Sequence, residues 1–382
     1  MISPVSLSSS NRLLSLEETS WVTQFSETYG QDIIYNLTMG TPFWSPPTSV
    51  QQAIIQSCGL TETYRYGATC GIPQLEKEIG KRLDLKFASS CGNEVMICSG
   101  SNQGFLNILL CLCNPGDEVI LFRPYYFSHY TACLLAGVKP VVVDTDSEFL
   151  PQPQSLEISV NTKLVVVVSP GNPSGRVIST DRLRSLYQLC FHRGVWLVID
   201  EAYEHFIFDG IETNSFSATD GVINLFTFSK SYSLAGLRVG YFCYPSYLRK
   251  SMLEIQDTIA THACHLAQQA ALAAFNDSSK EWIQKQVQEM VPRREIFWQV
   301  VSKYHTYRAN GGFFFFVPIP DSITSHDAVQ YLIQKYGILV FPGQLFGMSN
   351  YLRISYGSLS LHETKEAANQ LNDALATLWN NK

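Results

Sequence analysis

Short apolar runs alternate with amphipathic stretches through the middle of the chain. The run Leu164–Val168 is continuously apolar, and Thr180–Arg193 then repeats apolar residues at helical spacing. Continuous apolar strands separated by helices are typical of a mostly parallel sheet that is covered on both faces. The predicted strands are Glu94–Cys98, Glu118–Phe122, Lys139–Val143, Lys163–Val168, Val195–Ile199, Val222–Phe228 and Val239–Tyr244, and the predicted helices are Asn102–Cys113, His129–Ala136 and Thr180–Arg193.

The pattern changes after Tyr244. Two long helical stretches follow, and Pro292 is expected to kink or divide the second because proline lacks an amide donor. The stretches are Ser251–Phe275 and Lys280–Tyr304, followed by strands near Gly312–Pro318, Ile338–Phe341 and Tyr351–Tyr356 and a closing helix at His362–Trp379. The predicted fold class is α/β, with a mostly parallel seven-stranded sheet between helices in a large domain and a smaller α/β domain beside it. Residues 46–285 are assigned to the large domain, and residues 1–45 with 286–382 to the small one.

Composition narrows the class of protein. Hydrophobic residues make up 46% of the 382 positions, which is enough for a large core and excludes wholesale disorder. The formal net charge is −6 and there is no long basic run, which argues against a nucleic-acid or anionic-membrane partner. No apolar run approaches the roughly 18 residues of a membrane span. The first residues have one basic side chain, Arg12, and no apolar signal core, so a cytoplasmic location is expected.

The ten cysteines are scattered and form no CxxC pair. Cys111 and Cys113 form a CxC within an apolar, helix-like stretch. We interpret them as small buried hydrophobic residues rather than as metal ligands or a redox pair. No metal site is therefore predicted.

Two small-residue loops follow predicted strands. Ser99–Gly104 lies between a strand and a helix, where free amide groups favour a phosphate, although an ordinary capped turn has the same composition. Ser169–Gly175 contains two prolines and two glycines. It either presents the Asn172 amide to a ligand or forms a tight surface turn. In open α/β sheets, ligands bind at such strand ends.

Two further motifs follow predicted strands and contain charged side chains. Asp200-Glu201-Ala202-Tyr203 places a carboxylate at the end of an apolar strand, where it must face a cation or cap a helix. Lys230 ends the motif Thr227-Phe228-Ser229-Lys230. A lone lysine is usually a solvated surface group, but partial burial here would lower its pKa and make the amine nucleophilic.

Together, and in this order, the four motifs resemble those of fold type I pyridoxal-phosphate enzymes. The resemblance is specifically to the class I/II aminotransferase family related to aspartate aminotransferase, and it extends from about Asn36 to the C-terminus. It implies pyridoxal 5′-phosphate as the cofactor. It also implies a ping-pong transfer of an amino group between an L-amino acid and a 2-oxo acid.

The resemblance gives the motif residues their roles. Lys230 matches the lysine that forms an aldimine with the cofactor and then moves a proton between the substrate Cα and the cofactor. Asp200 matches the partner of the pyridine nitrogen, and Tyr203 and Asn172 match the pair that hydrogen-bonds the phenolic oxygen. The remaining predicted cofactor contacts are Gly100, Ser101, Asn102, Thr227, Ser229 and Arg238 around the phosphate and Tyr126 stacked on the ring.

The same resemblance implies where the substrate and a second subunit bind. Arg353 matches the arginine that binds the substrate α-carboxylate, with an ordinary salt bridge as the alternative. Gly40 matches a loop that closes over the substrate, and Trp44 is assigned to substrate binding with it. Tyr66 matches a tyrosine that reaches the phosphate of the neighbouring subunit, which predicts a homodimer with shared active sites.

The substrate side chain is less constrained. No second arginine can be assigned to a side-chain carboxylate, and aromatic residues are abundant near the predicted pocket edges, which favours aromatic substrates or methionine. These aromatic residues are Phe43, Trp44, Tyr125, Phe127 and Phe313–Phe316, although a buried strand is the commoner explanation of the last run. Plant-type aromatic aminotransferases that can use methionine have similar stretches at Pro124–Phe127, Pro170–Gly175, Ile255-Gln256-Asp257 and Tyr351-Leu352-Arg353.

Three alternatives remain open at this point. A lyase similar to aminocyclopropane-carboxylate synthases would share Lys230, Asp200 and Arg353, but would need no oxo-acid acceptor. An aspartate- or alanine-type aminotransferase would differ only in the side-chain pocket. A regulator built on an aminotransferase-like domain would carry an added helix-turn-helix domain, whereas only about 45 residues precede the motifs.

Overall fold

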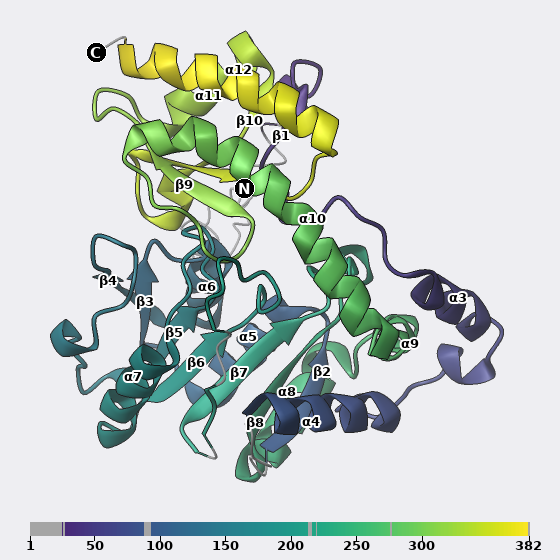
Figure 1. Ribbon diagram of the computed structural model, residues 1–382. Helices are drawn as coiled ribbons and strands as arrows, with labels where there is room; N and C mark the ends of the chain where they lie inside the picture. The colour runs from purple at the N-terminus through teal and green to yellow at the C-terminus, as the bar shows by residue number, and fades with distance from the viewer. Residues whose placement is uncertain are drawn as a thin grey trace, which may run out of the picture.

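The computed structural model describes residues 25, 27–87, 93–212, 216–218, 220–275 and 277–380. Its largest element is a seven-stranded sheet with the order β2-β8-β7-β6-β5-β3-β4 (Figure 1). Only β8 runs antiparallel to its neighbours, so the predicted mostly parallel sheet is confirmed. The strands are β2 (Asn93–Cys98), β3 (Glu118–Arg123), β4 (Lys139–Asp144), β5 (Thr162–Val168), β6 (Trp196–Asp200), β7 (Val222–Thr227) and β8 (Gly240–Pro245).

Helices cover both faces of this sheet. In β5, Leu164 and Val166 pack against one set of helices, while Val165 and Val167 pack against the other. All four side chains are buried, which explains why the strand is continuously apolar. The first face is covered by α5 (Ser101–Leu112), α6 (Phe127–Ala136) and α8 (Arg249–Ala260), and the second by α4 (Pro73–Phe87) and α7 (Thr180–His192).

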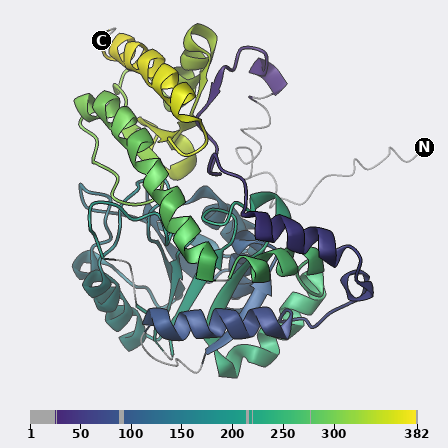
Figure 2. The ribbon, with the colours of Figure 1, turned by 45° about the vertical axis from the view of Figure 1, so that its right-hand side comes forward.

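Two further helices pack together next to α4. Helix α3 (Thr48–Ser57) packs on α9 (His265–Ala273), which also contacts α4 (Figure 2). Short 3₁₀ turns connect the larger elements at Thr61–Tyr64, Pro153–Ser155, Ala235–Leu237, Ser246–Leu248, Ser302–Tyr304 and Gly343–Phe346. No helix among the described residues is long and apolar enough to cross a membrane.

The C-terminal part forms a second group of strands and helices. A three-stranded antiparallel sheet has the order β11-β12-β9, and β1 pairs in parallel with β10. The segment near residue 35 therefore joins the C-terminal part, while the predicted domain boundaries remain a prediction. The elements are β1 (Tyr35–Asn36), β9 (Phe314–Pro318), β10 (Ile338–Leu339), β11 (Phe341–Pro342), β12 (Tyr351–Ser355), α11 (Ser325–Tyr336) and α12 (Leu361–Asn380).

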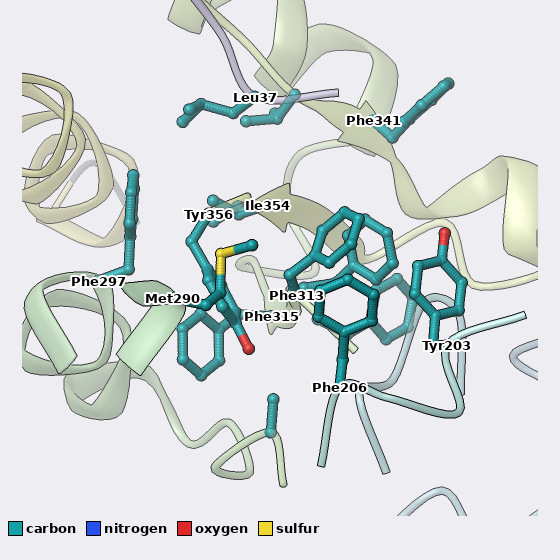
Figure 3. Close-up of a cluster of buried hydrophobic side chains, with 14 of the residues drawn as sticks. Leu37, Tyr203, Phe206, Met290, Phe297, Phe313, Phe315, Phe341, Ile354 and Tyr356 are labelled. Carbon is teal, nitrogen blue, oxygen red and sulfur yellow. The ribbon is translucent and has the colours of Figure 1, made fainter. Parts of the chain in front are cut away.

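The long helix α10 (Asp277–Val301) runs from the seven-stranded sheet to the C-terminal part (Figure 1). Aromatic side chains pack between it and the loop after β6. Phe313 contacts Tyr203 and Phe206 edge-on, with ring centroids 5.2 Å and 5.0 Å apart. Figure 3 shows Phe313 beside Phe206, with Met290 and Phe297 of α10 on the other side of the cluster. This apolar contact fixes the loop that carries Tyr203.

Three predictions about the C-terminal half are wrong in whole or in part, and one helix was missed. The expected helix Ser251–Phe275 is two helices, α8 and α9, because Thr261 adopts a positive φ of 57° and ends α8. Pro292 does not divide its helix, since α10 is continuous through it. The expected strand Ile338–Phe341 is two short strands in different sheets. Helix α11 was not predicted.

Candidate active site

A cavity of about 200 Å³ lies at the carboxyl ends of β5, β6 and β7. Parallel strands bring their carboxyl ends to one edge of a sheet, so motifs far apart in sequence meet there. The cavity is lined by ten of the predicted site residues: Ser101, Asn102, Tyr126, Asn172, Asp200, Tyr203, Thr227, Ser229, Lys230 and Arg238.

Lys230 follows β7 and carries the amine of the cavity. Its Nζ donates a hydrogen bond to the Gly40 carbonyl oxygen at 2.7 Å. Burial, reinforced by the nearby charges of Arg353 and Arg238, lowers the pKa of Lys230 to about 8. The neutral, nucleophilic form of this amine is therefore accessible near neutral pH. A Cβ on Gly40 would lie only 3.3 Å from Nζ, which favours glycine at this position.

Asp200 is the last residue of β6, and its side chain is 3% exposed. Its Oδ2 is 3.0 Å from His129 Nε2, and its Oδ1 accepts the Ala202 backbone N–H at 2.9 Å. These donors hold the carboxylate at the cavity wall. His129 was not predicted. It lies three residues after Tyr126, the N-cap residue of α6, and that helical spacing is the signal that could have identified it.

The guanidinium of Arg353 lies against aromatic rings. Its Cζ is 4.3 Å from the ring centre of Phe314 and 4.4 Å from that of Phe341. Nη1 donates to Asn172 Oδ1 at 3.0 Å, and Nη2 donates to the Thr38 carbonyl oxygen. Burial lowers the pKa of Arg353 to about 10.

Arg353 also retains an unused donor. Within the described ranges its Nε is buried without a hydrogen-bond partner, and no carboxylate there forms an ion pair with the guanidinium. The ordinary salt bridge considered from the sequence is therefore absent there. A buried cation with a free donor matches the needs of a carboxylate ligand.

The predicted phosphate end of the cavity is built from a tight turn and an arginine. Gly100 has a positive φ of 83°, and a Cβ there would lie 2.5 Å from Arg238 Nη2, so the site favours glycine. Arg238 is held by a 2.8 Å hydrogen bond from Nη1 to the Ala235 carbonyl oxygen. Thr227 Oγ1 lies 2.9 Å from Ser229 Oγ. Together with the first amide groups of α5, these groups suit an anion.

Tyr203 lies in the loop after β6 with its hydroxyl near Gly40 and Lys230. A Cβ built on Gly40 would be 3.6 Å from the Tyr203 oxygen. Burial raises the pKa of Tyr203, so the phenol keeps its proton and can donate it in a hydrogen bond.

Trp44 and Tyr66 lie outside the cavity of this chain. The Trp44 ring stacks on Phe206 with centroids 6.1 Å apart, so the structure gives no support to its predicted substrate contact. Tyr66 is 89% exposed. Its predicted contact with a neighbouring subunit needs a second chain and remains a prediction.

The CxC motif lies on and just after α5, away from the cavity. Burial raises the pKa of both thiols, that of Cys113 to about 12. Thiols in this state are weak nucleophiles and poor metal ligands. Among the residues placed by the structure, no three His, Cys, Asp or Glu side chains form a group that could hold a metal ion.

Comparison with known proteins identifies the family. Residues 32–371 match the family model described as aminotransferase class I and II. The aromatic aminotransferase ISS1 of Arabidopsis thaliana is 31% identical over 90% of each chain, and an aspartate aminotransferase of Pyrococcus abyssi is 28% identical over 91% of this chain and 92% of that one. The crystal structure of an aromatic aminotransferase from Pyrococcus horikoshii superposes with a TM-score of 0.84 at 26% identity, covering 93% of this chain and 99% of that one. The chain belongs to the class I and II aminotransferase family and is an aminotransferase.

Proposed function

We propose that this aminotransferase uses pyridoxal 5′-phosphate to move an amino group between an aromatic amino acid or methionine and a 2-oxo acid. The observation that carries the proposal is the meeting of Lys230, Asp200, Asn172 and Tyr203 in one cavity. Members of the family depend on this cofactor, so the residues present must be tested against it.

The lining of the cavity fits the cofactor at both ends. The turn at Gly100 and the Arg238 guanidinium offer donors for the phosphate. At the other end, the buried Asp200 carboxylate can accept a bond from a protonated ring nitrogen, while its other contacts are with His129 and the Ala202 amide. Tyr126 lines the same cavity and offers its ring for stacking.

The cofactor, when bound, supplies an electron-withdrawing ring that stabilises negative charge at the substrate Cα. The residues of the chain bind and orient the reactants. Asp200 keeps the ring nitrogen protonated, and Tyr203 and Asn172 donate hydrogen bonds to the phenolic oxygen. Lys230, with its lowered pKa, is able to take a proton from the substrate Cα and return it on the other side of the transfer.

Arg353 is proposed to bind the substrate α-carboxylate. A carboxylate from outside the chain would accept a hydrogen bond from the unpaired Nε and compensate the buried positive charge. The rings of Phe314, Phe341 and Phe346 lie 4.3 to 5.4 Å from its guanidinium carbon. These rings exclude water around the charge pair and strengthen it.

The aromatic surroundings also support the proposed substrate class. The cations that line the cavity are Lys230 and Arg238, and both have assigned roles there. Arg176, nearby, is ion-paired with Glu148. The described part of this chain therefore offers the cavity no spare cation for an aspartate or glutamate side chain, whereas aromatic and methionine side chains need none.

An aspartate-specific enzyme is the second candidate, because an aspartate aminotransferase is among the similar proteins. A half-reaction distinguishes the two. Cofactor-loaded protein is mixed with Phe, Tyr, Trp, Met, Asp, Glu or Ala, without any oxo acid, and the visible absorbance of the bound cofactor is followed. Loss of the visible band with the aromatic acids and methionine, but not with Asp, supports the proposal.

Two other outcomes of the half-reaction would contradict the proposal. Loss of the band mainly with Asp or Glu would contradict the proposed substrate class and require a distal cation. Release of product with the visible band retained would indicate a lyase. The Lys230→Ala variant serves as the control, since it is expected to bind the cofactor without a covalent bond and to carry out no transfer.

A further inference from the structure

We propose that Gln256 positions the phosphate-binding turn of the cofactor site by orienting the side-chain amide of Gln103. The inference rests on the proposed function, because it concerns the phosphate group of the proposed cofactor. Gln256 lies on α8 and is fully buried. It is not among the residues that line the cavity, so its effect on the cofactor must pass through another residue.

The first step is the contact between the two glutamines. Gln256 Oε1 accepts a hydrogen bond from Gln103 Nε2 at 2.8 Å and another from Asn107 Nδ2 at 2.6 Å. Both donors lie on α5, so a single oxygen of α8 binds two successive turns of that helix. An amide has one acceptor oxygen and one donor nitrogen. The Gln103 nitrogen also lies 3.4 Å from Asn107 Oδ1, but the shorter bond is the one to Gln256. The oxygen of Gln256 therefore selects the orientation in which the Gln103 nitrogen faces it.

The second step runs from Gln103 to the turn. With its nitrogen directed at Gln256, Gln103 presents Oε1 to the Ser99 backbone N–H, which donates to it at 2.5 Å. Gln103 is the third residue of α5 and reaches back across the start of the helix to Ser99, the residue before the N-cap Gly100. If the amide turned over, two donors would face each other at Ser99 and an acceptor would face an acceptor at Gln256.

The third step is the turn itself. Ser99 precedes Gly100, whose φ of 83° directs the chain from β2 into α5. The next residues, Ser101 and Asn102, line the cavity. Fixing the Ser99 N–H therefore fixes the start of the segment that carries the proposed phosphate donors. A displacement of a few tenths of an ångström in such donors weakens charge-assisted hydrogen bonds.

The burial of Gln256 argues against a purely structural role. Its Nε2 is buried and has no hydrogen-bond partner in the part of the chain that the structure describes. An unpaired buried donor is unfavourable, and an apolar side chain of the same shape would avoid that cost. A glutamine at this position is explained if its oxygen is needed to orient Gln103.

The test compares two ligands that differ only in the phosphate. The dissociation constants of pyridoxal 5′-phosphate and of pyridoxal are measured by absorbance titration for the wild type, Gln256→Met and Asn107→Leu. Loss of one neutral hydrogen bond corresponds to about a five- to tenfold change in affinity. We expect Gln256→Met to raise the dissociation constant of pyridoxal 5′-phosphate by this factor and to leave that of pyridoxal unchanged. The ³¹P resonance of the bound cofactor should shift as well.

The control variant, Asn107→Leu, removes the other bond to the same oxygen, together with the long 3.4 Å contact from Gln103 Nε2 to Asn107 Oδ1. Asn107 is also fully buried, but it does not contact Ser99. Asn107→Leu should lower the melting temperature without selective loss of the phosphate ligand. The proposal is overturned if Gln256→Met lowers the affinity for both ligands equally or for neither of them. It is also overturned if Gln256→Met has the same effect on the two affinities as Asn107→Leu.

A second variant keeps the test valid if Gln256→Met does not fold. Gln103 is partly exposed, and Gln103→Ala should show the same selective loss of the phosphate ligand. Equal weakening of both ligands by Gln103→Ala would also overturn the proposal. Failure of the proposed function is a different result: the wild type itself would then give no visible band with pyridoxal 5′-phosphate.

Discussion

Arg353 and Asn172, 181 residues apart in sequence, are joined by a 3.0 Å hydrogen bond from Nη1 to Oδ1. The bond connects β12 to the loop after β5, so it connects the C-terminal part to the edge of the seven-stranded sheet. It holds the guanidinium in one orientation, and Nε has no partner among the residues that the structure describes, so it is available to a ligand. The proposed carboxylate site is therefore prepared before the substrate arrives.

This arrangement predicts the effect of Arg353→Lys. An ammonium group keeps the charge but cannot bond Asn172, Thr38 and a carboxylate in one plane. We expect kcat/KM for the amino acid to fall about ten- to a hundredfold, with unchanged cofactor affinity. Steady-state kinetics and cofactor titration measure the two quantities. Arg176→Lys, in the loop that carries Asn172, is the control, and an equal loss there would refute the assignment.

A second prediction concerns pH. The pKa of Lys230 is about 8 in the folded, cofactor-free chain, against 10.5 for an unperturbed lysine. Below pH 8 the amine is charged in both states, so the cost of burying it is fully present. Between pH 8 and 10.5 the unfolded chain binds more protons, and stability rises with pH as that cost is relieved. Lys230→Met removes this contribution.

Urea unfolding of cofactor-free protein at several pH values tests the predicted contribution of Lys230 to stability. Lys230→Met should be more stable than the wild type at pH 7, and its advantage should shrink steadily between pH 8 and 10.5. The groups common to both proteins cancel in the difference. If the difference in the free energy of unfolding stayed constant across this range, burial would not lower the pKa of Lys230.

The sequence was sufficient to predict the site residues that lie at or just after the ends of predicted strands. Asp200 ends one apolar strand and Lys230 lies shortly after another, and the rule that parallel strands end at one edge of a sheet is enough to bring them together. The position of the Trp44 ring could not be predicted in this way. Trp44 lies four residues after Gly40, but its ring turns into the core and stacks on Phe206, a contact that depends on a distant segment.

Side-chain contacts between distant segments could not be predicted, because they depend on how those segments pack. Gln256 is 153 residues from Gln103, and nothing in the motif around it reveals which amide it meets. The break at Thr261 was missed because the residues on both sides of it have helical spacing, and a single positive φ separates α8 from α9. Periodicity reports a buried face but not where a helix ends.

A third prediction concerns a buried ion-pair network behind the cavity. Lys86 Nζ lies 2.6 Å from Glu201 Oε2 and 2.8 Å from Glu204 Oε2, and these two glutamates flank Tyr203. Removing one partner leaves a buried charge uncompensated, so Lys86→Met should reduce the free energy of unfolding by about 3–5 kcal/mol. The network ties α4 to the loop that carries Tyr203.

Lys81 provides a matched control on the same helix. It pairs with Glu78 at 2.7 Å, but its side chain is 58% exposed, against 14% for Lys86. Lys81→Met should therefore change the free energy of unfolding by no more than about 0.5 kcal/mol. Urea unfolding at pH 7 measures both variants. Similar small losses would show that the buried network contributes little.

The last prediction tests the proposed sharing of active sites between two subunits. Tyr66 is 89% exposed in the single chain, and the sequence resemblance predicts that it contacts the phosphate of a neighbouring subunit. If so, Lys230→Ala and Tyr66→Ala chains should complement each other, because a hybrid dimer contains one site with both residues intact. Random pairing of equal amounts makes half of the dimers hybrid, so co-refolding should restore about a quarter of the wild-type sites. Mixing Lys230→Ala with Lys230→Met cannot restore any and is the control. Activity no higher than that of the separate variants would place Tyr66 outside the neighbour's site.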